Sequence, residues 1–298
     1  MLILVGDNPF HGVSHLSQER ARARGKDVLN PEYAAYLVEL SVKNGAEGFM
    51  FSVDETTLSI LRLLREKEVA KDLKLYAITP AAYGYVRLMA PMGVSGLAKS
   101  FAKQVIVSGN LKAVIMGLKG AMFSDPTALL KSFLSYEISR IKSSSSKHMV
   151  LESIMLHEIV TDMALALDLR WLFNSYIKFM EELEITPGFE TRNFTYLISK
   201  FREWSINLND IMIAAPFNKV GFQMVPSRIA CERALELLPK PNVIAISVLA
   251  AGYLKPEEAI EYVKSLPNIK GLTVGVSKEK HANETFKLLA RERSLKSE

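Results

Sequence analysis

The stretch that decides the fold is the last third of the chain, which reads IMIAAPFN (211–218), VIAISVLAAGYL (243–254) and GLTVGVSKEKHANETF (271–286). Each piece holds a short apolar run, and amphipathic segments separate the pieces. The pattern predicts two βα units, then a strand and one more helix. A parallel barrel usually holds phosphate there, because free backbone N–H groups meet the start of a helix. We therefore expect a phosphorylated ligand at this end of the chain.

The same alternation extends to the N-terminus and gives eight predicted strands. They are 2–6, 48–53, 75–79, 153–157, 187–191, 211–215, 243–248 and 272–276. Eight strands alternating with helices predict an α/β fold, a closed (β/α)₈ TIM barrel, with residues 1–298 as a single domain. The run KAVIMGL (112–118) is a ninth candidate, but both of its flanks are helical. We therefore predict a helical insertion over 84–148 after the third strand, a lid or wall beside the barrel mouth.

Composition narrows the class of protein. The chain has 298 residues, 49% hydrophobic and 23% charged, with a net charge of +5 from 37 basic and 32 acidic residues. Positively and negatively charged residues alternate along the predicted helices, which is typical of solvent-exposed helix faces. We therefore expect no nucleic-acid partner. The quickly polar N-terminus and the lack of an apolar run of about 18 residues argue against a signal peptide and a membrane span. We expect a cytoplasmic protein that binds a small molecule.

Two weaker expectations come from the same sequence. Glutamine is scarce while lysine, glutamate, arginine and isoleucine are plentiful, a usage compatible with a thermophilic source. The insertion over 84–148 is the surface where we would first expect contacts in a homo-oligomer.

Catalytic groups of a TIM barrel come from the carboxyl ends of the strands and the loops that follow them. This rule selects the candidate residues. After the predicted strands stand Asp7, Asn8, His11, Asp54, His157, Glu158, Glu190, Arg192, Asn193, Phe217, Asn218, Ser277 and Lys278.

Acid–base chemistry is the first role we consider for these residues. His157 ends the run SIMLHE, and we expect it to converge with His11, Asp54 and Glu158 on one rim as a catalytic group. A satisfied structural histidine is the alternative. Asp54 directly follows a strand and orients a base or, alternatively, caps the next helix. Both roles are open to one residue.

The segment DNPFHGVSH (7–15) also invites a metal interpretation, with Asp7, His11, His157 and Glu190 as ligands. No H-x-H or HExxH spacing supports it, and loop-ordering hydrogen bonds from Asp7 and Asn8 are the simpler interpretation. We predict no metal. We place Asp7, Asn8, Glu190 and Arg192 against the substrate.

The second half of the chain resembles the aldo/keto reductase superfamily. GFETRNF (188–194) is similar to that family's strand-five signature, APFNKVGF (215–222) to its Pro-Tyr-Asn segment, and VGVSKEKHANETF (274–286) to its phosphate and adenosine region. The resemblance implies an NADP or NAD cofactor. It implies that Asn193 holds the nicotinamide carboxamide and that Phe217, beside Asn218, stacks on the nicotinamide. Ser277, Lys278 and His281 are implied on the phosphate side.

The catalytic half departs from the family's tetrad of Asp, Tyr, Lys and His. Asp54 and His157 match two members. The tyrosine position falls at Leu58 or Ser59, and the lysine position at Pro80. Loss of a general acid lowers the reaction rate by a factor of roughly 10² to 10⁴. Tyr83 and Tyr85 are substitute donors, and they lie next to and within the start of the predicted insertion.

Three functions remain open. The leading one is an NAD(P)-dependent oxidoreductase of unusual chemistry on a small carbonyl or hydroxy metabolite. The second is a lyase, isomerase or hydrolase of a small phosphorylated metabolite, with Glu158, Glu190 and His11 as acid–base groups. The third is a non-catalytic ligand-binding barrel. The fold alone does not choose among them.

Overall fold

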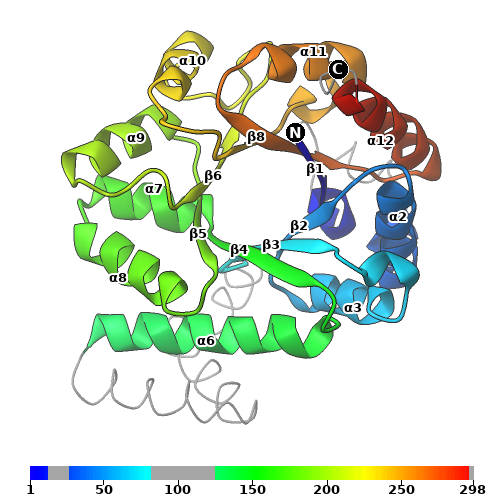
Figure 1. The fold of residues 1–298 in the computed structure, drawn as a ribbon, viewed down its shortest axis with the longest axis horizontal. Coiled ribbons are helices and arrows are strands. Elements are labelled where there is room, and N and C mark those ends of the chain that lie inside the picture. Colours follow the sequence, from blue (N-terminus) through cyan, green and yellow to red (C-terminus); the bar gives the residue numbers. More distant parts are fainter. Residues whose placement is uncertain (13–26, 82–124, 295–298) are drawn as a thin grey trace.

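Eight parallel strands close into a barrel at the centre of the molecule (Figure 1). The structure is a computed structural model, and it describes residues 1–12, 27–81 and 125–294. The strands are β1 (Leu2–Gly6), β2 (Gly48–Ser52), β3 (Lys74–Thr79), β4 (Val150–Leu156), β5 (Thr186–Glu190), β6 (Met212–Pro216), β7 (Val243–Ile246) and β8 (Ile269–Gly275). Each strand pairs with the next, and β8 pairs with β1. The predicted TIM barrel is confirmed, and every predicted strand overlaps an observed one.

Helices surround the barrel and connect the strands (Figure 1). In the described residues they are α2 (Pro31–Lys43), α3 (Glu55–Leu64), α6 (Pro126–Ser144), α7 (Glu158–Ala166), α8 (Arg170–Glu181), α9 (Phe194–Glu203), α10 (Arg228–Glu236), α11 (Pro256–Ser265) and α12 (Glu279–Ser294). Short 3₁₀ turns are η1 (Asn8–His11), η2 (Asp27–Leu29), η3 (Glu68–Ala70) and η4 (Ala250–Gly252). Several helices begin where a side-chain oxygen accepts a first-turn N–H, as Asn30 does for α2, Asp125 for α6 and Ser227 for α10.

The helix α6 takes an ordinary place in the ring. It packs against α3 and α8 and connects β3 to β4 (Figure 1). The last part of the expected insertion is therefore a barrel helix, because its buried face is needed to cover the strands. Residues 84–124 lie outside the described residues, together with Tyr83, Tyr85 and the ninth strand candidate at 112–118. The lid thus stays a prediction.

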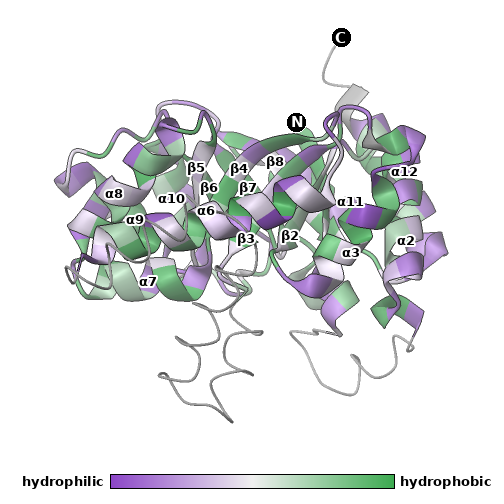
Figure 2. Cartoon of the chain, turned by 90° about the horizontal axis from the view of Figure 1, so that it is seen from below, coloured by the Kyte–Doolittle hydropathy of each residue, from purple (hydrophilic) through white to green (hydrophobic). Residues whose placement is uncertain are grey.

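The core has two layers, which follow from the alternation of side chains along each strand. On β1, Leu2 and Leu4 face the barrel interior, while Ile3 and Val5 face the helices. Hydrophobic residues dominate the strands and hydrophilic ones the outer helix faces (Figure 2). The interior between the two ends of the barrel is thus packed with side chains.

Among the helices that the structure describes, none combines the length and the apolar character that a membrane crossing requires.

Candidate active site

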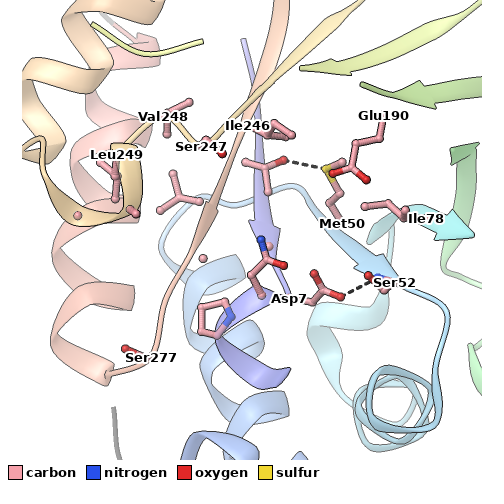
Figure 3. Close-up of a pocket in the computed structure, with 18 of the residues that line it drawn as sticks. Asp7, Met50, Ser52, Ile78, Glu190, Ile246, Ser247, Val248, Leu249 and Ser277 are labelled. Atoms are coloured by element: carbon pink, nitrogen blue, oxygen red, sulfur yellow. Dashed lines mark hydrogen bonds between the residues drawn. The ribbon is translucent and has the colours of Figure 1, made fainter. Parts of the chain in front are cut away.

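A cavity of about 470 Å³ opens at the carboxyl ends of the strands. Its walls come from the ends of β1, β2, β3, β5, β7 and β8 and from the loops that follow β1, β4, β5, β7 and β8. In Figure 3, Glu190, Ile78 and Met50 lie on one side, while Leu249 and Ser277 lie on the other. This is the end of a TIM barrel where active sites form.

The structure separates the predicted site residues into two groups. Those that line the cavity are Asp7, Asn8, His157, Glu158, Glu190, Arg192, Ser277, Lys278 and His281. Those that do not are His11, Asp54, Asn193, Phe217 and Asn218. Nine of the fourteen predicted site residues therefore line the cavity.

One side of the cavity, which we call the acid wall, consists of Asp7, His157, Glu158, Glu190 and Arg192. Glu190 ends β5 and is 9% exposed. Burial, together with the nearby negative charge of Glu158, raises the pKa of Glu190 to about 8. Arg192 contacts Glu158 and neutralises it. The Glu190 carboxyl group therefore carries a proton at neutral pH and is placed to donate it into the cavity.

His157 is a buried, neutral member of the acid wall. Its Nδ1 accepts a hydrogen bond of 3.2 Å from the backbone N–H of Ile159, which caps α7. Burial lowers the pKa of His157 below its ordinary value. An imidazole that accepts through Nδ1 carries its proton on Nε2. His157 therefore caps α7 and is also a hydrogen-bond donor at the cavity.

Asp162 organises the loop after β5, and sequence reasoning did not single it out. It accepts hydrogen bonds from the Thr191 hydroxyl at 2.5 Å, from the backbone N–H of Arg192 at 3.2 Å and from the Asn193 side-chain amide at 3.0 Å. Burial raises the pKa of Asp162. The expectation that Asn193 faces a ligand is thus corrected, because its amide group is used inside the protein.

Phe217 and Asn218 also lie away from the cavity. The Phe217 ring is fully buried between barrel and helices, edge-on to Phe194 with ring centres 5.2 Å apart. Asn218 holds the next turn, since its amide donates to the Phe222 carbonyl at 2.8 Å and its oxygen accepts from the Phe222 N–H at 2.7 Å. The placement of Phe217 corrects the stacking role that the family resemblance implied.

His11 and Asp54 lie behind the acid wall. His11 Nε2 is 3.0 Å from Asp7 Oδ2, and His11 Nδ1 is 3.2 Å from Asp54 Oδ2. Asp54 also caps α3, accepting from the Thr57 N–H at 3.0 Å while Thr57 accepts from the Asp54 N–H. Asp54 therefore both caps α3 and orients His11. Neither Asp54 nor His11 lines the cavity itself.

The opposite side, which we call the anion wall, consists of Ser247–Leu249, Ala251, Gly252, Ser277, Lys278 and His281. Backbone strain is concentrated in its first loop, where Ser247 has a φ of 53° and Ala251 one of 59°. The helix α12 begins beside Lys278 and offers the unpaired N–H groups of its first turn. These groups could pair with an anion, and a phosphate at this wall stays a prediction.

Gln223 connects the two walls and was also missed by sequence reasoning. Its side-chain oxygen accepts from the Arg192 guanidinium and, at 3.1 Å, from the Ser247 hydroxyl. No catalytic motif surrounds Gln223 in the sequence, so its role was not predictable there. Within the described residues, no group of three or more His, Cys, Asp or Glu side chains is arranged to hold a metal ion.

Two solved structures share this architecture. A proposed aldo-keto reductase from Pseudomonas aeruginosa is 12% identical, with a TM-score of 0.57 over 97% of this chain and 89% of that chain. A second structure of a proposed aldo-keto reductase from that organism is 13% identical, with a TM-score of 0.56 over the same shares. The sequence matches no protein-family profile and no curated protein. At such low identity the likeness shows the fold alone, a TIM barrel that these two structures share.

Proposed function

We propose that the chain is an oxidoreductase that uses NADP or NAD to interconvert a small carbonyl compound and its alcohol. The observation that carries this proposal is the pairing of two unlike walls across one cavity. The acid wall offers a buried carboxylic acid in Glu190, and the anion wall offers Ser277, Lys278 and the start of α12. The fold of the two similar structures supports the same reaction class.

The residues present fit the phosphate end of a nicotinamide nucleotide. Lys278 and His281 supply cationic or donor groups, and Ser277 supplies a hydroxyl group, all at the cavity edge. The nicotinamide end has no counterpart of the expected amide and aromatic ring, because Asn193 and Phe217 point elsewhere. The apolar cavity lining of Met50, Ile78 and Ile246 takes their place as packing surface.

A nicotinamide nucleotide, with its phosphates held by Ser277, Lys278 and His281, would supply the hydride for a carbonyl carbon. Glu190 supplies the proton that the carbonyl oxygen then needs, which is the task of the tetrad tyrosine in the aldo/keto reductases. His157 donates a hydrogen bond from Nε2 and orients that oxygen. Burial keeps water away from Glu190 and keeps its carboxyl group protonated. In the reverse direction, the Glu190 carboxylate takes the proton of the alcohol.

The test is a binding screen that compares NADPH, NADH, flavin mononucleotide and ribose 5-phosphate by thermal shift. Neither Trp171 nor Trp204 lines the cavity, so the fluorescence of NADPH itself is the better optical signal. NADPH or NADH is expected to raise the melting temperature and to bind in the micromolar range. A Lys280→Met protein serves as the control, since Lys280 lies on the same helix but outside the cavity. Binding of neither nucleotide would refute the proposal.

The displaced Asn193 and Phe217 favour a second candidate, an acid–base enzyme that acts on a small phosphorylated metabolite without redox chemistry. In that case ribose 5-phosphate stabilises the protein while neither nicotinamide nucleotide does. A protein that binds NADPH but reduces no member of a carbonyl panel would instead be a non-catalytic barrel.

A further inference from the structure

Asp7 divides its two carboxylate oxygens between the protein and the cavity. Oδ2 accepts from the backbone N–H of Ser52 at 2.6 Å and lies 3.0 Å from His11 Nε2. Among the residues that the structure describes, Oδ1 has no hydrogen-bond partner, although Asp7 lines the cavity and is only 5% exposed. Figure 3 shows Asp7 reaching toward Ser52, with Glu190 on the far side of the space between them. Oδ1 is therefore the oxygen left for a ligand.

The orientation of Asp7 is fixed from behind by His11. Both ring nitrogens of His11 face carboxylates, Nε2 toward Asp7 and Nδ1 toward Asp54. Nε2 is hydrogen-bonded to Asp7, and Nδ1 forms an ion pair with Asp54 when the imidazole is protonated on both nitrogens. Burial lowers the pKa of His11, but the hydrogen bond and charge of Asp7 and the charge of Asp54 raise it, and the net shift is upward. The two carboxylates thus favour the protonated form of His11.

Asp54 gives this arrangement a rigid base. Its carboxylate is held by the Thr57 N–H at the first turn of α3, and the Thr57 hydroxyl donates to the Ser52 carbonyl at the end of β2. Asp54, His11 and Asp7 therefore form one linked series from a helix start to the cavity. We call this series the Asp–His–Asp unit.

We propose that Asp7 accepts a hydrogen bond from a hydroxyl group of the substrate through Oδ1, and that His11 and Asp54 are positioning residues for this contact. A carboxylate can only accept, so the ligand group must be a donor. The negative charge of the Asp7 carboxylate itself disfavours a phosphate or carboxylate of the substrate at this point. The substrate is therefore a hydroxylated compound. This inference rests on the proposed function and narrows its substrate class.

The first measurement needs no ligand. Histidine ring signals are followed by NMR against pH, with Asp54→Asn and Asp7→Asn as variants and His148→Gln as the matched control at an exposed site. His11 is expected to titrate above the ordinary pKa of about 6.5. Its pKa should fall in both Asp variants and stay unchanged in the control. If the pKa of His11 were unchanged in Asp54→Asn, the Asp–His–Asp unit would be refuted.

The second measurement uses xylitol as a neutral polyol probe, observed by saturation-transfer NMR. Wild-type protein is expected to bind it saturably, with affinity lowered at least about tenfold by Asp7→Asn and about threefold by His11→Gln. Near-UV circular dichroism verifies folding, and His11→Gln keeps the test valid if Asp7→Asn does not fold. Unchanged affinity in a folded Asp7→Asn protein, or no saturable signal from the wild type, overturns the proposal. NADPH is titrated in parallel, because its failure to bind refutes the oxidoreductase alone.

Discussion

The acid wall and the anion wall lie on opposite sides of one cavity and are built by different means. The acid wall consists of ionisable side chains, and the pKa of Glu190 in it is raised by burial and by the charge of Glu158. The anion wall relies on a strained loop around Ala251, a helix start and exposed groups such as Lys278. The first wall therefore controls where a proton resides, and the second controls which ligand stays bound. Substitutions in the acid wall should therefore lower the turnover rate, and substitutions in the anion wall should lower ligand affinity.

The largest effect is expected from Glu190→Gln, which keeps the shape of the side chain but removes the acid. Turnover should fall by roughly 10² to 10⁴, the usual contribution of a general acid. NADPH affinity should stay within about twofold, because the anion wall is untouched. Steady-state kinetics and an NADPH fluorescence titration measure the two quantities. Weaker NADPH binding at unchanged turnover would reverse the assignment of the walls.

The same residue should make protein stability depend on pH. The pKa of Glu190 is raised to about 8 in the folded protein, against about 4.3 in an unfolded chain. The folded state binds the extra proton between these values. The stability this contributes is complete below about pH 4 and is lost as pH rises to 8, by up to about 1.4 kcal/mol per unit. Urea unfolding at pH 5, 6.5 and 8 should show a steeper loss for wild type than for Glu190→Gln. Parallel curves would show that Glu190 is ionised at neutral pH.

A smaller effect is expected on the anion wall. Lys278→Met should weaken NADPH binding by about three- to tenfold, since one exposed cation is lost next to a phosphate group. Turnover at saturating NADPH should stay unchanged. The difference in NADPH affinity between Lys278→Met and wild type should shrink at high salt. The matched control is Lys280→Met, on the outer surface of α12. Equal losses in both proteins would point to general surface charge.

The smallest effect on ligand binding is expected from Asn193→Ala. The Asn193 amide donates to Asp162 and does not line the cavity. NADPH affinity should therefore change by less than about twofold, while the free energy of unfolding falls by about 1 kcal/mol for the lost hydrogen bond. Isothermal titration and urea unfolding measure the two effects. A tenfold loss of NADPH affinity would instead indicate that Asn193 contacts the nucleotide.

The misplacement of Phe217 has a cause that is visible in the sequence. Along β6, Met212 and Ala214 face the barrel interior, while Ile213 and Ala215 face the helices. Continuing this alternation by two residues places Phe217 outward, where it is found. For the direction of Phe217, the alternation along the strand is therefore a stronger signal than the family resemblance.

Asn193 is different, because no local pattern predicts its partner. Asp162 stands 31 positions earlier on α7, and only the packing of α7 beside β5 brings the two together. Loop residues have no periodicity that would fix the direction of their side chains. Sequence reasoning could place Asn193 at the correct end of the barrel, but not the direction of its amide group.

The sequence by itself determined the barrel, its eight strands and the end at which the cavity forms. Alternating apolar residues and helix caps act over a few positions, so they can be read along the chain. Only the tertiary structure decided that Glu190 keeps a proton and that His11 lies between Asp7 and Asp54. Both results depend on burial and on charges brought from distant strands, and these exist only once the barrel has closed.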